Sequence, residues 1–222
     1  MDIENKKSIL RDNIIKAAHI YSYKMAGKHY LYIFEGHCFE MYYGIENFLH
    51  LVGVDTRLSP IDFYRNAQRG ILNTGQFGFS ARHPLATAWK KSKALLKLES
   101  FLHEGYFIIK DVETETAFYP YAITDIDRSL LLGLDRDKKV KDTEIYIPQS
   151  LRIKGNIFNK SEDNKIFEIN SIFSKTDYEA PYSLILYKDR MDFNALDSAV
   201  KIELIEIYLA IYAVPKVEIS AT

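Results

Sequence analysis

The change of pattern near Gly105 limits the fold of this chain more than any other feature. Before it, apolar residues recur at helical spacing; after it come short β-forming runs such as YFIIKD, AFYPYA and EIYIPQSLRI. Helices followed by strands are typical of an α+β domain, whereas a parallel α/β fold alternates them. We therefore predict a single α+β domain over residues 1–222, with a helical part at about 1–104 and a β-rich part at about 105–222, in which helices flank an antiparallel sheet.

The helical part predicts its own order of elements. Residues 7–26 form a first helix, and YLYIFE and CFEMYY form a hairpin around Gly36 and His37. Ser59 and Pro60 begin a short helix. A longer one begins at Pro84 and keeps an apolar face as far as Leu102. The apolar segment at 200–214 fits either a helix or a strand.

Composition excludes several classes of protein. Hydrophobic residues make up 47% of the chain and charged residues 27%, which is typical of a folded globular protein. The single cysteine, Cys38, rules out an intramolecular disulfide and a cysteine-based zinc cluster. The first residues are polar and no apolar run reaches membrane-spanning length. We expect a soluble, cytoplasmic protein without a membrane partner.

Common catalytic motifs are absent from the sequence. It has no GxxxxGK[ST] loop, no GxGxxG, no GxSxG and no HExxH. The six histidines show no metal-ligand spacing, and the aspartates between residues 125 and 137 fit solvated turns better than a calcium loop. We predict no metal and no cofactor. Acid-base chemistry remains, such as RNA cleavage through the RNA's own 2′-hydroxyl, which needs a base, an acid and positive charge near the phosphate.

His50 is the strongest candidate for such a base. It stands in the apolar stretch CFEMYYGIENFLHLVGV, between Leu49 and Leu51. An imidazole exchanges protons near neutral pH. If the segment is a strand, His50 points away from the face that Leu49 and Leu51 share. A structural histidine in the core remains the alternative.

Further candidates follow from residue type and spacing. Lys93 and Lys97 lie one helical turn apart and are able to hold a phosphate, and Lys97 is expected to turn inward among leucines. Lys90 and Lys91 are better explained as solvated helix surface. Arg152 is a candidate for a forked phosphate contact, and Ser183 and Lys188 for transition-state donors.

Two more positions are candidates for binding substrate. Arg82 and His83 stand in the Gly-containing loop FGFSARHP before a helix, where an anion could bind. Tyr64 is one of several tyrosines that could stack on unpaired bases. Loop mobility and simple packing explain these residues equally well.

The ordered series FEMYYGIENFLHLVGVDTRLSPIDFYRNAQRGIL and KKSKALLKLESFL resembles the phage-associated nuclease domains grouped with barnase, EndoU, colicin and RelE ribonucleases. In those domains a hairpin leads into a Phe-x-His-Leu-x-Gly segment and then a helix with a Phe-Tyr pair, and the strands IPQSLRIK and PYSLILYK resemble their Ser-bearing strands. The resemblance implies a ribonuclease fold of that group and metal-independent RNA cleavage. It also implies a toxin-like role in a phage, prophage or mobile element. The residues to which we assign it are the catalytic His50, Lys97, Arg152 and Ser183 and the substrate-binding Lys93, Arg82, His83, Tyr64 and Lys188.

Two other functions remain open at this stage. The same fold with an inactive site would be an RNA-binding or protein-binding module in phage defence or regulation. A structural or assembly protein would use the segment at 200–214 to associate. RNA and an inhibitory or regulatory protein are the expected partners, and the oligomeric state stays open.

Overall fold

The long first helix, α1 (Ile3–Lys24), forms because it buries one continuous stripe. Asp2 caps it by accepting a hydrogen bond from the Asn5 backbone N–H, and the stripe consists of Leu10, Ile14, Ala17, Ala18 and Tyr21. Gly27 follows at φ +75° and ends the helical segment, as predicted.

This computed structural model describes residues 2–35, 37–114, 116–139, 144–153, 166–177 and 179–187.

The predicted hairpin follows as β1 (His29–Phe34) and β2 (His37–Tyr42). Every residue of β1 is buried, so this strand has protein on both faces. Phe34 pairs with His37. The turn therefore comes one residue earlier than predicted, and His37 belongs to the strand.

Short elements then surround α1. They are η1 (Ile45–Asn47), α2 (Phe48–Val52), β3 (Asp55–Thr56), α3 (Pro60–Gln68), η2 (Thr74–Gln76), β4 (Phe77–Gly78), α4 (Leu85–Leu95) and η3 (Leu98–Leu102). Ser59 caps α3 through the Asp62 N–H, as the sequence predicts. The expectation of one helix from Pro84 to Leu102 is wrong beyond Leu95, because tighter turns, with Lys97 N–H bonded to the Ala94 carbonyl, turn Phe101 into the core.

The β-rich part contributes β5 (Tyr106–Glu113), β6 (Phe118–Asp125), β7 (Leu130–Arg136), β8 (Ile145–Ile153), β9 (Ile166–Glu168), β10 (Ser171–Lys175) and β11 (Ser183–Tyr187). With β1 and β2 they form one sheet in the order β11-β10-β1-β2-β8-β7-β6-β5-β9. All described pairings are antiparallel except that of β2 and β8, where Glu40 pairs with Ile145 and Met41 with Tyr146. The predicted α+β class with a mostly antiparallel sheet is confirmed.

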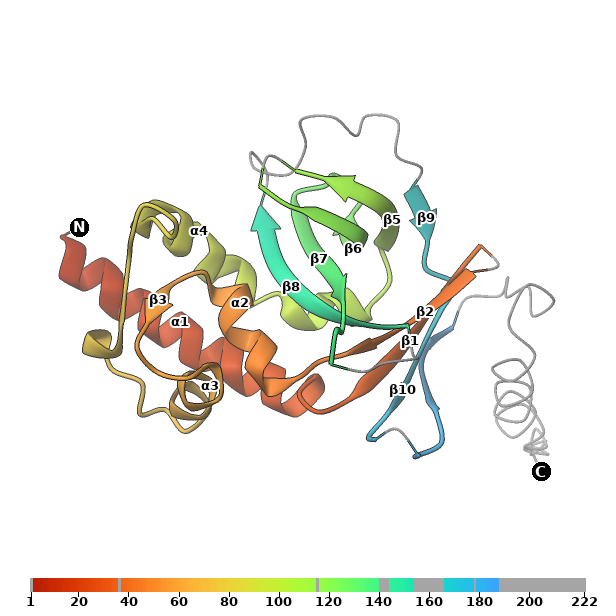
Figure 1. The fold of residues 1–222 in the computed structure, drawn as a ribbon, viewed down its shortest axis with the longest axis horizontal. Coiled ribbons are helices and arrows are strands. Elements are labelled where there is room, and N and C mark those ends of the chain that lie inside the picture. Colours follow the sequence, from red (N-terminus) through yellow and green to blue (C-terminus); the bar gives the residue numbers. More distant parts are fainter. Residues whose placement is uncertain are drawn as a thin grey trace, which may run out of the picture.

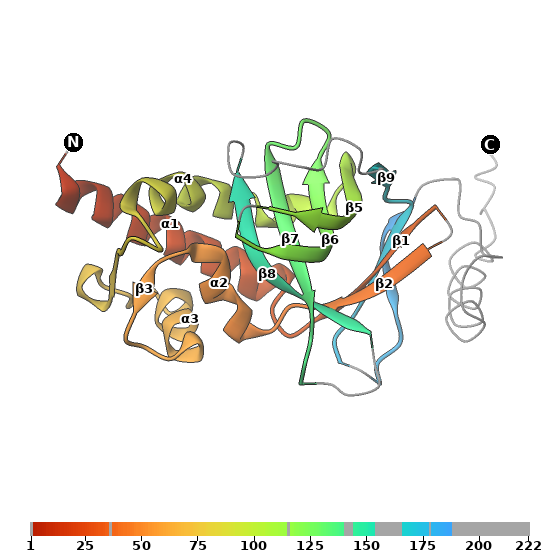
Figure 2. The ribbon, with the colours of Figure 1, turned by 45° about the horizontal axis from the view of Figure 1, so that its top comes forward.

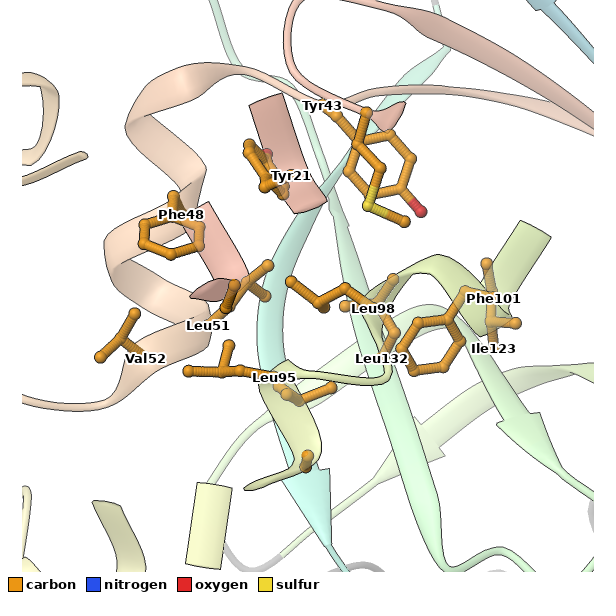
Figure 3. Packing of buried hydrophobic residues seen from close by; sticks show 14 of the residues in the cluster. Tyr21, Tyr43, Phe48, Leu51, Val52, Leu95, Leu98, Phe101, Ile123 and Leu132 are labelled. Atoms are coloured by element: carbon orange, nitrogen blue, oxygen red, sulfur yellow. The ribbon is translucent and has the colours of Figure 1, made fainter. Parts of the chain in front are cut away.

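The helices gather at one end of the molecule, and β1, β2 and β10 lie at the other, with the curled strands β5 to β8 between them (Figures 1 and 2). One hydrophobic cluster includes side chains from both parts, among them Phe48 and Leu51 of α2, Leu95 of α4 and Leu132 of β7 (Figure 3). This shared core fixes α2 and α4 against the sheet near β8.

Two sequence predictions fall on other parts of the chain. Lys188 and the segment at 200–214 lie outside the described residues. Within the described ranges, no helix combines the length and the hydropathy that crossing a membrane requires.

Candidate active site

The short helix α2 determines where His50 points. Phe48, Leu51 and Val52 are buried in the core, and the helical period leaves His50 on the opposite side, where it is exposed. The alternative of a buried core histidine is therefore wrong, and so is the strand conformation considered for this segment. Gly53 then ends the helix in the left-handed region at φ +71° and ψ +48°.

Lys91 of α4 lies against this glycine. A Cβ atom added to Gly53 would be 2.9 Å from the Lys91 Nζ atom, so the end of the lysine side chain lies directly on this glycine, whose left-handed conformation disfavours other residues. Burial of the ammonium, together with the positive charge of Arg152, lowers the pKa of Lys91 to about 8. Lys91 is therefore poised to lose a proton just above neutral pH.

Arg152, near the end of β8, is held by Tyr119 of β6 and by Thr116 just before β6. Its Nε and Nη2 atoms donate to the Tyr119 hydroxyl at 3.1 and 2.9 Å, and Nη2 donates to Thr116 Oγ1 at 2.8 Å. The Tyr119 ring itself packs on Gly133 of β7, where an added Cβ would meet the ring at 2.8 Å. The bare backbone of Gly133 thus lets Tyr119 lie where it can orient the guanidinium.

We call His50, Lys91 and Arg152 the cationic cluster. Helices α2 and α4 contact each other and both contact β8, and the end of β8 lies beside α4 in Figure 1. Although His50 reaches solvent, partial burial and the Lys91 ammonium lower the pKa of the imidazole. Within the described chain, no carboxylate forms an ion pair with His50 or Lys91. The charges of Lys91 and Arg152 therefore repel one another, and the charge of Lys91 also acts on His50.

Two of the predicted catalytic residues, His50 and Arg152, each interact electrostatically with Lys91. Lys97 is exposed just beyond the end of α4, so the expectation that it turns inward is wrong. Ser183 is exposed on β11, at the opposite edge of the sheet from β9 and four strands from β8. Neither joins the cationic cluster in the described structure.

The predicted binding residues have separate environments. Arg82 is exposed in the turn before α4, and His83 Nδ1 bonds to Asp55 Oδ1 at 2.6 Å. Lys93 is exposed, with its Nζ 5.5 Å from the centre of the Trp89 ring. Tyr64 is buried and packs edge-on against Tyr21 and Phe48, so its ring belongs to the core.

Sequence reasoning missed Lys91, Tyr119 and Thr116. The expectation that Lys91 is solvated surface is wrong. Its signal was present, because Lys91 stands three residues after Ala88 and four before Leu95, both of which are buried on the core face of α4. Tyr119 and Thr116 carried no signal, because only the pairing of strands brings them to Arg152.

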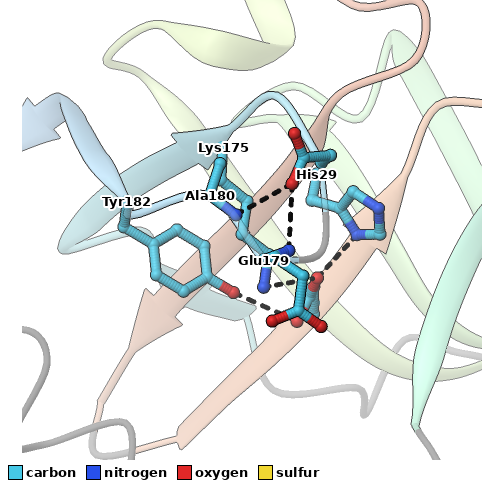
Figure 4. A network of polar contacts seen from close by, with 7 residues as sticks. His29, Lys175, Glu179, Ala180 and Tyr182 are labelled. Atoms are coloured by element: carbon cyan, nitrogen blue, oxygen red, sulfur yellow. Dashed lines mark hydrogen bonds and ion pairs between the residues drawn. The ribbon is translucent and has the colours of Figure 1, made fainter.

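A second polar group, which we call the Glu40 network, joins β1, β2 and β10 (Figure 4). Glu40 Oε1 lies 2.6 Å from His29 Nδ1 and 3.5 Å from Lys175 Nζ, and the Tyr182 hydroxyl donates to Oε2 at 3.0 Å. Burial alone would raise the pKa of Glu40, but His29, Lys175 and Tyr182 outweigh it and the pKa is lowered. The network links neighbouring strands through a satisfied carboxylate.

Metal ligands do not gather in the described part of the chain. No group of three His, Cys, Asp or Glu side chains there could hold a metal ion. Asp125 instead accepts hydrogen bonds from the Ser129 and Leu130 backbone N–H groups in a turn, as expected for a turn residue. The metal-independent reaction stays a prediction.

The family model described as phage-Barnase-EndoU-ColicinE5/D-RelE like nuclease4 matches residues 13–191. The chain belongs to this nuclease family. The matched range contains the whole of α2, α4 and β8, and with them the cationic cluster. No curated protein and no solved structure matches the chain significantly.

Proposed function

We propose that this nuclease is an endoribonuclease that cleaves RNA without a metal ion, through attack of the RNA's own 2′-hydroxyl, and that the cationic cluster is its active site. One observation carries the proposal: Lys91, with a lowered pKa, lies against Gly53 in the same cluster as His50 and Arg152 and has no carboxylate partner in the described chain. A scissile phosphate supplies the negative charge that His50 and Lys91 do not meet within the described chain.

His50 acts as the base in this proposal. Its lowered pKa leaves the imidazole neutral at pH 7, so it can take the proton of the 2′-hydroxyl. The 2′-oxygen forms a bond to phosphorus while the bond from phosphorus to the 5′-oxygen breaks. The products are a 2′,3′-cyclic phosphate and a free 5′-hydroxyl.

Lys91 supplies the proton for the leaving oxygen. A pKa of about 8 keeps most of its side chain protonated at pH 7 yet makes the ammonium a better acid than an ordinary lysine. After the reaction Lys91 is neutral and His50 is protonated, so one proton exchange with solvent restores both. Arg152 stabilises the charge on the phosphate oxygens, in an orientation fixed by Tyr119.

The biological setting belongs to the same proposal. The name of the family supports a phage-type enzyme. A ribonuclease that acts on the RNA of a host works in the cytoplasm as a toxin and needs an inhibitory partner until it acts. Lys97 and Ser183 have no part in the proposed chemistry.

The experiment is incubation of the purified protein with labelled RNA in EDTA, beside His50→Ala and Lys91→Met variants matched to the parent by circular dichroism. Cleavage by the parent that leaves 2′,3′-cyclic phosphate ends and is lost in both variants is the expected result. Cleavage that needs Mg²⁺, or that survives in His50→Ala, contradicts the proposal. RNA binding without cleavage by the parent would make the protein a binding module instead.

A further inference from the structure

The segment that carries α3 and α4 has an unusual charge distribution. Residues 63–98 contain seven Lys and Arg side chains and no Asp or Glu. This leaves 22 of the 29 basic residues, against all 30 acidic residues, for the rest of the chain. The near-neutral total thus hides one basic stretch, whose side chains near α3 and near α4 are two separate candidate surfaces for a polyanion.

Three of these lysines form a ridge on α4 and just after it. Lys90 and Lys93 lie three residues apart on one side of α4, Lys97 follows just beyond the end of the helix, and all three are exposed. Within the described chain none of them forms an ion pair with a carboxylate, unlike Lys24, which pairs with Glu99 at 2.9 Å. We call Lys90, Lys93 and Lys97 the α4 ridge.

The α4 ridge adjoins the cationic cluster through Lys91. Lys91 follows Lys90 directly but is turned about 100° around the helix, toward Gly53 and His50. Three exposed lysines thus follow one another from the middle of α4 to just beyond its end, so the ridge can contact up to three phosphates of one strand. Positive charge therefore continues from the cluster along the exposed side of α4.

We infer that the α4 ridge binds the phosphate backbone of a single-stranded RNA beside the scissile phosphate. This inference rests on the proposed function and extends it to the substrate, which is an RNA strand several nucleotides longer than a dinucleotide. Charge complementarity argues for the occupant, since exposed lysines without carboxylate partners match a row of phosphates. An unpaired strand fits better than a duplex, because the attacking 2′-oxygen must line up opposite the leaving 5′-oxygen.

The test measures the affinity of the full chain for a 2′-O-methyl RNA ten nucleotides long, at several salt concentrations. The blocked 2′-oxygen prevents cleavage, so binding is measured apart from catalysis. The ridge variant is Lys90→Gln/Lys93→Gln/Lys97→Gln. The control variant, Lys16→Gln/Arg65→Gln/Arg69→Gln, also removes three exposed charges, one on α1, one on α3 and one directly after α3. Helix α3 lies on the other side of α1 from α4 (Figures 1 and 2).

Each lost phosphate contact should reduce the slope of log affinity against log salt by about 0.7, so the slope of the ridge variant should be less steep by about 2. Its affinity at 0.1 M salt should be lower than that of the parent by on the order of 100-fold. The control variant should follow the parent. A ridge variant that binds like the parent, or a control variant that loses as much, overturns the inference. Failure of the proposed function looks different, because the parent would then bind this RNA through the ridge but leave unmodified RNA uncut.

Discussion

The cationic cluster and the Glu40 network each combine a histidine with basic side chains, but their charges are balanced in opposite ways. Glu40 lies at the centre of its network and interacts with His29, Lys175 and Tyr182. No carboxylate occupies the same place beside His50 and Lys91 in the described structure, and the pKa values of both groups are lowered. The charge of Glu40 is thus balanced within its network, whereas we propose that the cationic cluster receives its balancing charge from a bound phosphate.

The largest expected effect comes from removing the Lys91 charge. Lys91→Met should reduce RNA cleavage by about 10³-fold, because it removes the proposed acid and a phosphate contact. Stability should stay the same or rise, since a partly buried charge is replaced by an apolar chain of similar length. Initial rates and urea denaturation measure both. Lys16→Met, at an exposed position of α1, is the control, and a destabilised Lys91→Met would contradict the contrast between the two regions.

The Glu40 network should respond in the opposite way. Glu40→Gln removes the carboxylate charge that faces Lys175 and His29, which should lower the free energy of unfolding by about 3 kcal/mol. The matched control is Glu46→Gln, which removes an ion pair with the mostly exposed Lys139. This substitution should lower the free energy of unfolding by less than about 1 kcal/mol. If cleavage by folded Glu40→Gln is abolished, the Glu40 network belongs to the catalytic machinery and the comparison fails.

Tyr119 tests how the cationic cluster is held in place. Tyr119→Phe removes the hydroxyl that accepts from Arg152 Nε and Nη2 but keeps the ring on Gly133. We expect KM to rise about tenfold with a smaller change in kcat, because loss of an oriented hydrogen bond to a charged group costs about 1.5 kcal/mol. Equal losses in kcat and in kcat/KM with KM unchanged would mean that Tyr119 acts only in the transition state.

The pH dependence of stability should show the smallest effect. Below pH 8 the folded protein carries a protonated Lys91 in an unfavourable place, while the unfolded chain keeps its lysine protonated up to its ordinary pKa of 10.5. From pH 8 to about 9.5 the unfolded state therefore binds more protons, and stability should rise by about 1 kcal/mol after allowance for partial exposure. Denaturation of the parent and of Lys91→Met at each pH gives the difference. A rise of the same size in Lys91→Met would assign it to other groups.

Much of the fold could be predicted from local pattern. The stripe of α1, the Ser59 cap of α3 and the hairpin β1–β2 each depend on residues close in sequence. The parallel contact between Glu40 and Ile145 had no such signal, because more than a hundred residues separate the partners. The break of the predicted long helix after Leu95 also depends on tertiary packing of Phe101.

The site could be predicted only in part. The sequence contained His50 and Arg152, but their neighbourhood depends on α2 and α4 packing on β8. Among the lysines of α4 the choice of Lys97 over Lys91 was wrong, because the helix ends before Lys97 and leaves it exposed. Leucines directly beside a lysine in the sequence did not indicate whether its side chain turns inward. Apolar residues three and four positions away did, because they lie on the same face of the helix.

The most direct test of the central claim is the pH profile of kcat/KM for RNA cleavage by the parent and by Lys91→Arg. The parent should show a bell, with a rising limb below the ordinary histidine value of 6.5 and a falling limb near pH 8. Lys91→Arg should keep only residual activity and lose the falling limb, because arginine does not deprotonate in this range. A parent profile without the fall near pH 8, or a variant that keeps it, would contradict the assignment of the cationic cluster as the active site.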